Sequence, residues 1–159
     1  MKKSVWFMLY LTLLLLSPGV SADTVPKYSQ YSVASVYAGK AAPVSLNTKN
    51  KRMFRTRLRE STQNPVDFAG EYTVTTWGCG TSCVMGAVVS KKTGNVVWLP
   101  GSICCWEGSD DMLQYRKNSR LLVIGGMINE EGVYGSHFYE FTGKKFKRIK
   151  TVPLPSSHH

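Results

Sequence analysis

The body of the chain opens with a helical pattern of apolar positions. Met53, Phe54 and Leu58 recur at one-turn spacing, so a helix over residues 47–61 would bury one apolar stripe. The Asn47-Thr48 pair supplies residues that suit an N-cap at its start. The rest of its surface is crowded with cations: Lys49, Lys51, Arg52, Arg55, Arg57 and Arg59. The segment therefore predicts an amphipathic helix with a basic outer face.

From residue 72 onward the pattern changes to short β-branched and aromatic runs separated by tight turns. The predicted strands are Tyr72–Trp77, Cys83–Ser90, Val96–Leu99, Met112–Arg116, Arg120–Ile124, His137–Phe141 and Phe146–Val152. Because parallel strands need longer crossover connections than these turns provide, the pattern favours an antiparallel meander.

Together the two patterns predict an α+β fold, in which one N-terminal amphipathic helix packs on a partly rolled antiparallel sheet. The single domain would span residues 47–152. A lead-in segment, 23–46, would precede it, and a flexible tail, 153–159, would follow it.

The first 22 residues have the pattern of a cleavable secretory signal peptide. Two lysines precede the apolar run Val5–Leu16, and the small residues Val20 and Ala22 suit a cut before Asp23. The run is shorter than the roughly 20 residues that a membrane span requires. We therefore expect a periplasmic or secreted protein with no stable membrane insertion after cleavage.

The excess of basic residues indicates what kind of partner to expect. The chain has 20 Lys and Arg against 10 Asp and Glu, a formal net charge of +10. This excess favours an anionic partner, either an envelope component or the acidic face of an envelope or secreted protein; plain solubility is the alternative. Nucleic acid is not expected in this compartment, and no nucleic-acid motif occurs. Arg52, Arg55 and Arg59 are therefore candidate binding residues.

The four cysteines, Cys79, Cys83, Cys104 and Cys105, predict two disulfides, because their number is even and the chain is expected in an oxidising compartment. We favour crossed pairing between 79/83 and 104/105, since a bond between adjacent residues closes a strained ring. A Cys79–Cys83 bond remains open. A Cys₄ zinc site and a redox pair are weaker alternatives, because adjacent cysteines fit zinc poorly and the first pair is not C-x-x-C. No metal or cofactor is expected.

The first cysteine pair lies in a motif that carries a resemblance. Phe68-Ala69-Gly70-Glu71-Tyr72 and Trp77–Cys83 resemble the F-A-G-x-Y and W-G-C-G-T-x-C motifs of a family of small exported bacterial proteins of unassigned function. The similarity covers residues 52–150. The position of Glu71 is often His in that family, so this chain departs from the pattern there. The resemblance implies export and one compact domain, and it implies no activity.

Candidate catalytic residues are few. His137 is the only histidine outside the C-terminal His158-His159. A small envelope hydrolase that uses Glu71 or Asp67 with His137 is one hypothesis. Glu140 lies three residues along the same predicted strand and would point to the opposite face of the sheet.

The leading hypothesis is binding without catalysis, by an inhibitor, immunity-type or envelope-interaction protein that acts through a rigid, disulfide-stapled loop. Trp77 and Trp106 are candidate binding residues beside the cysteines, and Trp98 could extend a stacking platform. Aromatic packing over a disulfide is the structural alternative for both tryptophans.

Overall fold

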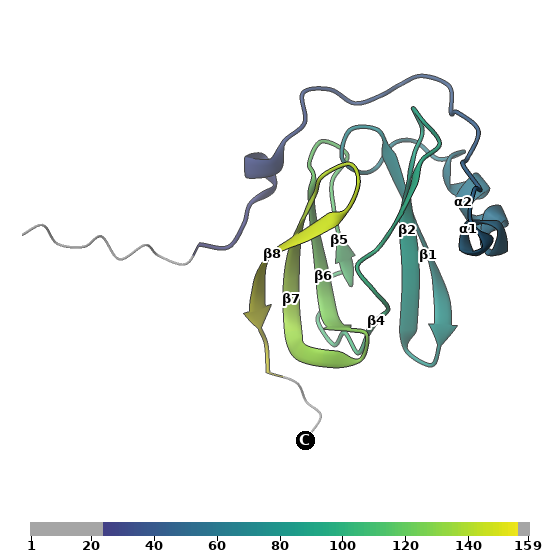
Figure 1. The fold of residues 1–159 in the computed structure, drawn as a ribbon. Coiled ribbons are helices and arrows are strands. Elements are labelled where there is room, and N and C mark those ends of the chain that lie inside the picture. The colour runs from purple at the N-terminus through teal and green to yellow at the C-terminus, as the bar shows by residue number, and fades with distance from the viewer. Residues whose placement is uncertain (1–23, 156–159) are drawn as a thin grey trace, which may run out of the picture.

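The computed structural model describes residues 24–155 (Figure 1). The expected signal peptide and its cleavage site lie outside the described residues, as does most of the expected flexible tail. Within the described range no helix has the length and apolar character needed to span a bilayer.

Eight antiparallel strands of the described residues form one open sheet (Figure 1). They are β1 (Tyr72–Gly80), β2 (Cys83–Ser90), β3 (Val96–Trp98), β4 (Ile103–Cys104), β5 (Leu113–Gln114), β6 (Leu121–Ile128), β7 (Glu131–Phe141) and β8 (Phe146–Pro153). Their order is β1-β2-β4-β6-β7-β8, with β3 paired to β2 and β5 paired to β6. The predicted antiparallel sheet is confirmed, although β3 and β5 are side branches rather than successive strands of one meander.

The predicted helix is present as two short helices. They are α1 (Lys49–Met53) and α2 (Arg55–Ser61), and they meet at Phe54, whose φ of −100° and ψ of 17° depart from helical values. At the start of α1 the side chain of Thr48 accepts a hydrogen bond from the backbone N–H of Lys51 at 3.3 Å, which confirms the N-cap.

The sheet curves so that strands from its two ends share one core. The ring of Tyr72 in β1 lies 4.7 Å from that of Phe141 in β7, although three strands separate these elements in the sheet order. Phe68, fully buried just before β1, packs on Phe141 at 5.4 Å. The helices cover the other face of β1 and β2, where Leu58 is fully buried against Val89. Leu58 therefore anchors α2 on the sheet, whereas α1 has no buried residue and is held through Phe54, which stacks on Trp77.

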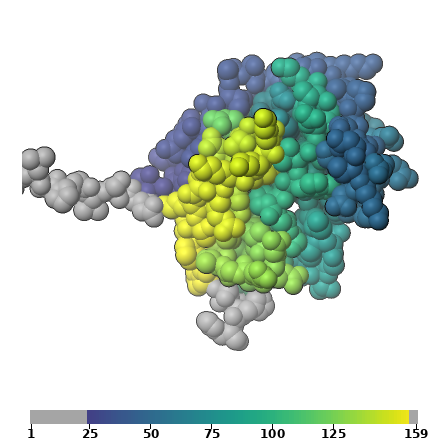
Figure 2. Space-filling model, viewed as in Figure 1, coloured from purple at the N-terminus to yellow at the C-terminus, as the bar shows by residue number. Residues whose placement is uncertain are grey.

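The described part of the lead-in segment, residues 24–46, crosses the upper edge of the sheet to reach the helices (Figure 2). Its 3₁₀ helix η1 (Tyr28–Tyr31) packs on β6 and β7. Further along, the backbone of Ser45 bonds to the carbonyl of Gly94 in the β2–β3 turn. Gly94 has a φ of +73°, and a Cβ there would meet the backbone of Pro43, so only glycine suits this close approach.

Candidate functional site

The helix face consists of α1, α2 and the sheet tryptophans beneath them. Arg52, Arg55 and Arg59 are all exposed on it. The Arg52 guanidinium donates to the Leu46 carbonyl at 3.2 Å, and that of Arg55 donates to the Arg52 carbonyl at 3.3 Å. Within residues 24–155 none of the α1 and α2 cations forms an ion pair. Their charge therefore faces solvent without neutralisation by the protein.

Three aromatic rings pack together between the helices and the sheet. Phe54, at the junction of the helices, stacks on Trp77 with ring centroids 4.5 Å apart. Trp98 meets Trp77 edge-on at 5.8 Å and Phe54 at the same distance. The indole Nε1 of Trp77 is buried and has no hydrogen-bond partner among the described residues. The packing explains the position of Trp77 without any contact to a disulfide.

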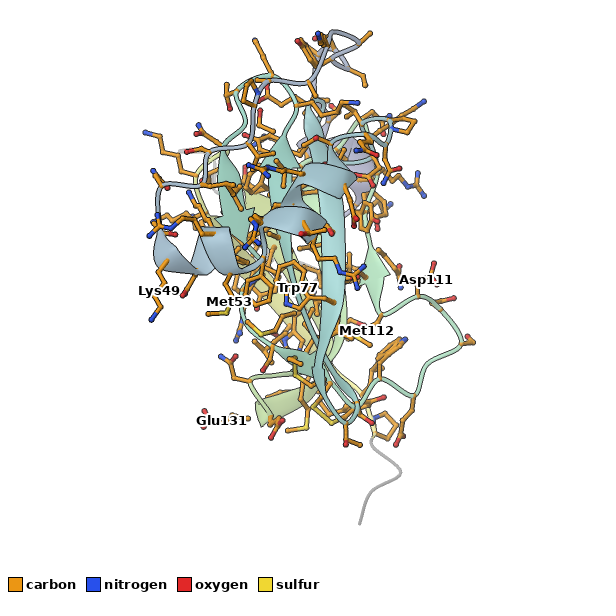
Figure 3. All side chains as sticks on the ribbon, turned by 90° about the vertical axis from the view of Figure 1, so that its right-hand side faces the viewer. Lys49, Met53, Trp77, Asp111, Met112 and Glu131 are labelled. Atoms are coloured by element: carbon orange, nitrogen blue, oxygen red, sulfur yellow. A yellow bond between two sulfur atoms is a disulfide. The ribbon has the colours of Figure 1, made fainter. Side chains whose placement is uncertain are left out.

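A small cavity opens beside this cluster. Its volume is about 150 Å³, and it lies between α1 and the strands, lined by Asn50, Phe54, Met85, Gly86, Trp98, Leu99 and Gly101. Met53, next to Phe54, is 62% exposed, so the prediction that it belongs to the buried stripe of the helix was wrong. Figure 3 shows Lys49 and Met53 projecting from α1, with Trp77 close by on the sheet. Apolar surface and positive charge therefore occur together on this face.

The disulfide end comprises the β1–β2 turn, the segment Ile103–Asp111 and the β6–β7 turn, which lie at the lower end of the sheet in Figure 1. Its disulfides join Cys79 to Cys83 and Cys104 to Cys105. The favoured crossed pairing was therefore wrong, and the local alternative for the first pair is correct. A bulge between Gly78 and Gly80 in β1 accompanies the approach of Cys79 to Cys83, whose Cα atoms are 5.1 Å apart.

The second disulfide joins neighbours in the chain. Cys105 adopts a φ of +67°, a left-handed conformation that turns the chain sharply after β4. Cys104 is paired across the sheet with Cys83, so the two disulfides lie side by side. The two pairs of cysteines are thus neighbours in the structure, although no disulfide joins one pair to the other.

Trp106 belongs to the disulfide end and not to the helix face. Its ring lies against β6 at Gly125, where a Cβ would come within 2.6 Å of the ring, so the close packing needs glycine. Its Nε1 donates to the Asp110 carbonyl at 2.7 Å. The ring also lies 6.2 Å from that of Tyr134 in β7. The structure thus separates the two candidate tryptophans and places only Trp77 beside the basic residues.

Charge distinguishes the disulfide end as well. It carries Glu107, Asp110, Asp111, Glu130 and Glu131, half of the acidic residues of the chain. No Lys or Arg occurs in residues 93–115 or 121–143. These segments of the sequence therefore contain no basic residue, although Arg148 of β8 and Glu131 line one hollow.

His137 is held inside the sheet. It is 3% exposed, its Nδ1 lies 3.1 Å from the Thr151 hydroxyl, and its Nε2 lies 3.1 Å from the Gly126 carbonyl. Because a carbonyl only accepts, Nε2 carries the proton and donates to Gly126, while Nδ1 accepts from Thr151. Burial lowers the pKa of His137, and the nearby positive charge of Arg148 acts in the same direction. The ring is therefore neutral and fully bonded within the protein.

The two carboxylates proposed to act with His137 have partners of their own. Glu71 accepts a hydrogen bond from the Ser90 hydroxyl at 2.6 Å. Asp67 accepts from the backbone N–H of Val74 at 2.9 Å, and burial raises the pKa of its carboxyl. Glu140, which was not expected to face His137, pairs with Arg120 at 2.6 Å. No hydrogen bond joins His137 to either carboxylate among the described residues.

His137 does border a hollow of about 440 Å³ that the sequence did not indicate. Glu131, Arg148 and Thr151 also line it. Glu131 begins β7, and Arg148 and Thr151 lie in β8, so only the strand pairing brings them together. Met85 was missed in the same way, because its position opposite Trp77 follows from the β1–β2 register.

Among the described residues no cluster of three or more His, Cys, Asp and Glu side chains is arranged to hold a metal ion. Comparisons with models of protein families, with curated proteins and with solved structures found no match for this chain. The resemblance to a family of exported proteins therefore remains a prediction, and function is argued from the surfaces themselves.

Proposed function

We propose that the protein is an exported, disulfide-stapled binding protein of the bacterial envelope that works without catalysis and docks an anionic partner on its helix face. The partner is an acidic surface of an envelope or secreted protein, or an anionic envelope component. The inhibitor, immunity and envelope-interaction types of protein all fit this class.

One observation carries the proposal: unpaired cations surround exposed apolar surface on a rigid support. Arg52, Arg55 and Arg59 are exposed and lack carboxylate partners within the described part of the chain. Met53 and the cavity beside Phe54 supply apolar contact area within the same face. Charge steers an anionic partner toward such a face, and burial of apolar surface then stabilises the complex.

Affinity capture from an envelope extract tests this proposal. The wild-type protein is compared with Arg52→Glu/Arg55→Glu/Arg59→Glu and with a matched control, Lys144→Glu/Lys145→Glu/Lys147→Glu, whose exposed side chains lie at the β7–β8 turn. Both variants change the net charge equally. We expect one partner to be retained by the wild type and the control and lost by the helix variant. Loss from both variants, or from neither, would contradict docking on the helix face.

A hydrolase that uses Glu71 or Asp67 with His137 remains the alternative. A general base must reach its substrate proton, and both ring nitrogens of His137 already have partners inside the protein. We therefore expect His137→Ala to leave partner capture intact. If a hydrolytic activity is found and this variant loses it while keeping its melting temperature, the enzyme hypothesis replaces the binding one.

A further inference from the structure

The two disulfides are neighbours across one pair of strands. Cys83 of β2 lies opposite Cys104 of β4 in the antiparallel register. Directly opposed residues in antiparallel strands have Cα atoms about 4.5–5.5 Å apart and side chains on the same face. Disulfides generally join Cα atoms about 4.4–6.8 Å apart. A Cys83–Cys104 bond therefore fits the existing backbone.

The four cysteines differ in their access to solvent. Cys79 is exposed in the β1–β2 turn, whereas Cys104 is only 3% exposed. Cys83 and Cys105 are half-buried. Thiol–disulfide exchange requires a thiolate to reach a sulfur atom, so its rate depends on access. An external thiol reaches the Cys79–Cys83 bond before it reaches the buried sulfur of Cys104.

We propose that the four cysteines form a two-step thiol–disulfide exchange site whose substrate is an external dithiol. In the first step a substrate thiolate attacks Sγ of Cys79, forms a mixed disulfide and releases Cys83 as a thiolate. In the second step Cys83 attacks Sγ of Cys104 and releases Cys105. Cys83 thus carries the exchange from the exposed bond to the buried one.

The reaction balances without another oxidant. The second thiol of the substrate attacks the mixed disulfide and releases Cys79 as a thiol. The dithiol loses two electrons and two protons and becomes a disulfide. The protein keeps one disulfide, Cys83–Cys104, and gains two thiols, at Cys79 and Cys105.

The exchange acts on the segment that follows Cys105. The left-handed turn at Cys105 leads directly into Trp106, which packs on β6 and bonds to the Asp110 carbonyl. Opening the Cys104–Cys105 bond removes the covalent constraint on this turn. The redox state of the cysteines thereby alters the Trp106 segment.

Peptide mapping tests the first part of the proposal on the wild-type mature protein. Trypsin cuts after Arg59, Lys91, Lys92 and Arg116, so each disulfide of the structure lies within one peptide, 60–91 or 93–116. The protein is mixed with one equivalent of dithiothreitol, alkylated, and digested without reduction. We expect peptides 60–91 and 93–116 to become cross-linked, with the alkyl label on Cys79 and Cys105. Labelling without a cross-link, or a cross-link before dithiothreitol is added, overturns the proposal.

A kinetic comparison tests the order of the steps. With Cys79→Ser/Cys83→Ser, the Cys104–Cys105 bond loses its internal attacker. Dithiothreitol must then attack the half-buried Cys105 directly, because Cys104 is buried, and reduction should slow roughly tenfold or more. The exposed substitution Thr81→Ser in the same turn is the control and should react at the wild-type rate. Equal rates in all three proteins overturn the relay. If the double variant does not keep the wild-type near-ultraviolet circular dichroism, the peptide map of the wild type decides alone.

Discussion

The helix face and the disulfide end are held in place by different means. On the helix face Leu58 is fully buried and Phe54 stacks on Trp77, so packing fixes the position of α1 and α2. At the disulfide end the turn residues between Cys79 and Cys83 are exposed, and a covalent bond closes the turn. The comparison teaches that this small domain uses apolar packing where a second layer covers the sheet and cross-links where the sheet is uncovered.

The two regions also differ in charge. The helix face presents arginine and lysine without ion-pair partners in the described range, and the disulfide end carries acidic residues with no neighbouring Lys or Arg in its segments. Segregated charge orients a partner during encounter, because each sign attracts its opposite over about a Debye length. The molecule therefore has two surfaces that attract partners of opposite charge.

The largest expected effect comes from removing packing under the helix face. Leu58→Ala should lower the free energy of unfolding by about 2–5 kcal/mol, because it leaves a cavity against Val89. Met53→Ala, on the same helical pair but 62% exposed, should change it by less than about 0.5 kcal/mol. Urea unfolding of the two variants measures both. Similar losses would mean that α1 and α2 are not anchored as described.

A smaller effect is expected at the disulfide end. Cys79→Ser/Cys83→Ser should cost about 2 kcal/mol, because a bond across four residues of sequence closes a short loop in the unfolded chain. Cys104→Ser/Cys105→Ser should cost clearly less, since a bond between neighbours closes almost no loop. The same urea experiment compares them. A larger loss for the second pair would indicate that its role in the folded state outweighs chain entropy.

The smallest expected effect is the dependence of stability on pH at His137. Burial lowers the pKa of its ring below 6.5, so the unfolded chain binds a proton more readily than the folded one. The folded protein is stabilised because it keeps the His137 ring neutral. This stabilisation is complete above the pKa of the ring in the unfolded chain, and it is lost as the pH falls toward the lower pKa of the ring in the folded protein. His137→Gln should therefore lose less stability than the wild type between about pH 7 and about pH 5. Parallel pH profiles for the two proteins would contradict the buried neutral state.

The local patterns of the sequence predicted the elements well. The strand predicted over Tyr72–Trp77 follows from β-branched and aromatic residues, and in the structure it extends to Gly80. The Thr48 cap follows from its position before the helical stripe. The break between α1 and α2 at Phe54 was not predicted. Phe54 has a non-helical backbone conformation, and its ring stacks on Trp77, which lies in a strand distant in sequence. Tertiary packing, which the helical pattern does not contain, therefore divides the helix.

The candidate site was predicted only in part, because it depends on the order of the strands. Trp77 and Trp106 both neighbour cysteines in the sequence, but Trp77 faces Phe54 whereas Trp106 packs on β6. The prediction of the disulfide pairing was wrong for a similar reason. The β1 bulge and the left-handed Cys105 favour local bonds, and neither conformation is readable from the positions of the cysteines.

Binding of a defined polyanion tests the central claim, that an anionic partner docks on the helix face, most directly. Polyglutamate is titrated into the mature protein, and tryptophan fluorescence reports occupancy near Trp77 and Trp98. The account predicts that affinity falls as salt is raised from about 50 to about 300 mM, and that Arg52→Glu/Arg55→Glu/Arg59→Glu weakens binding roughly tenfold. The Lys144→Glu/Lys145→Glu/Lys147→Glu control should bind nearly as the wild type does. Equal weakening by both variants would show that net charge alone attracts the polyanion, and would contradict a docking site on the helix face.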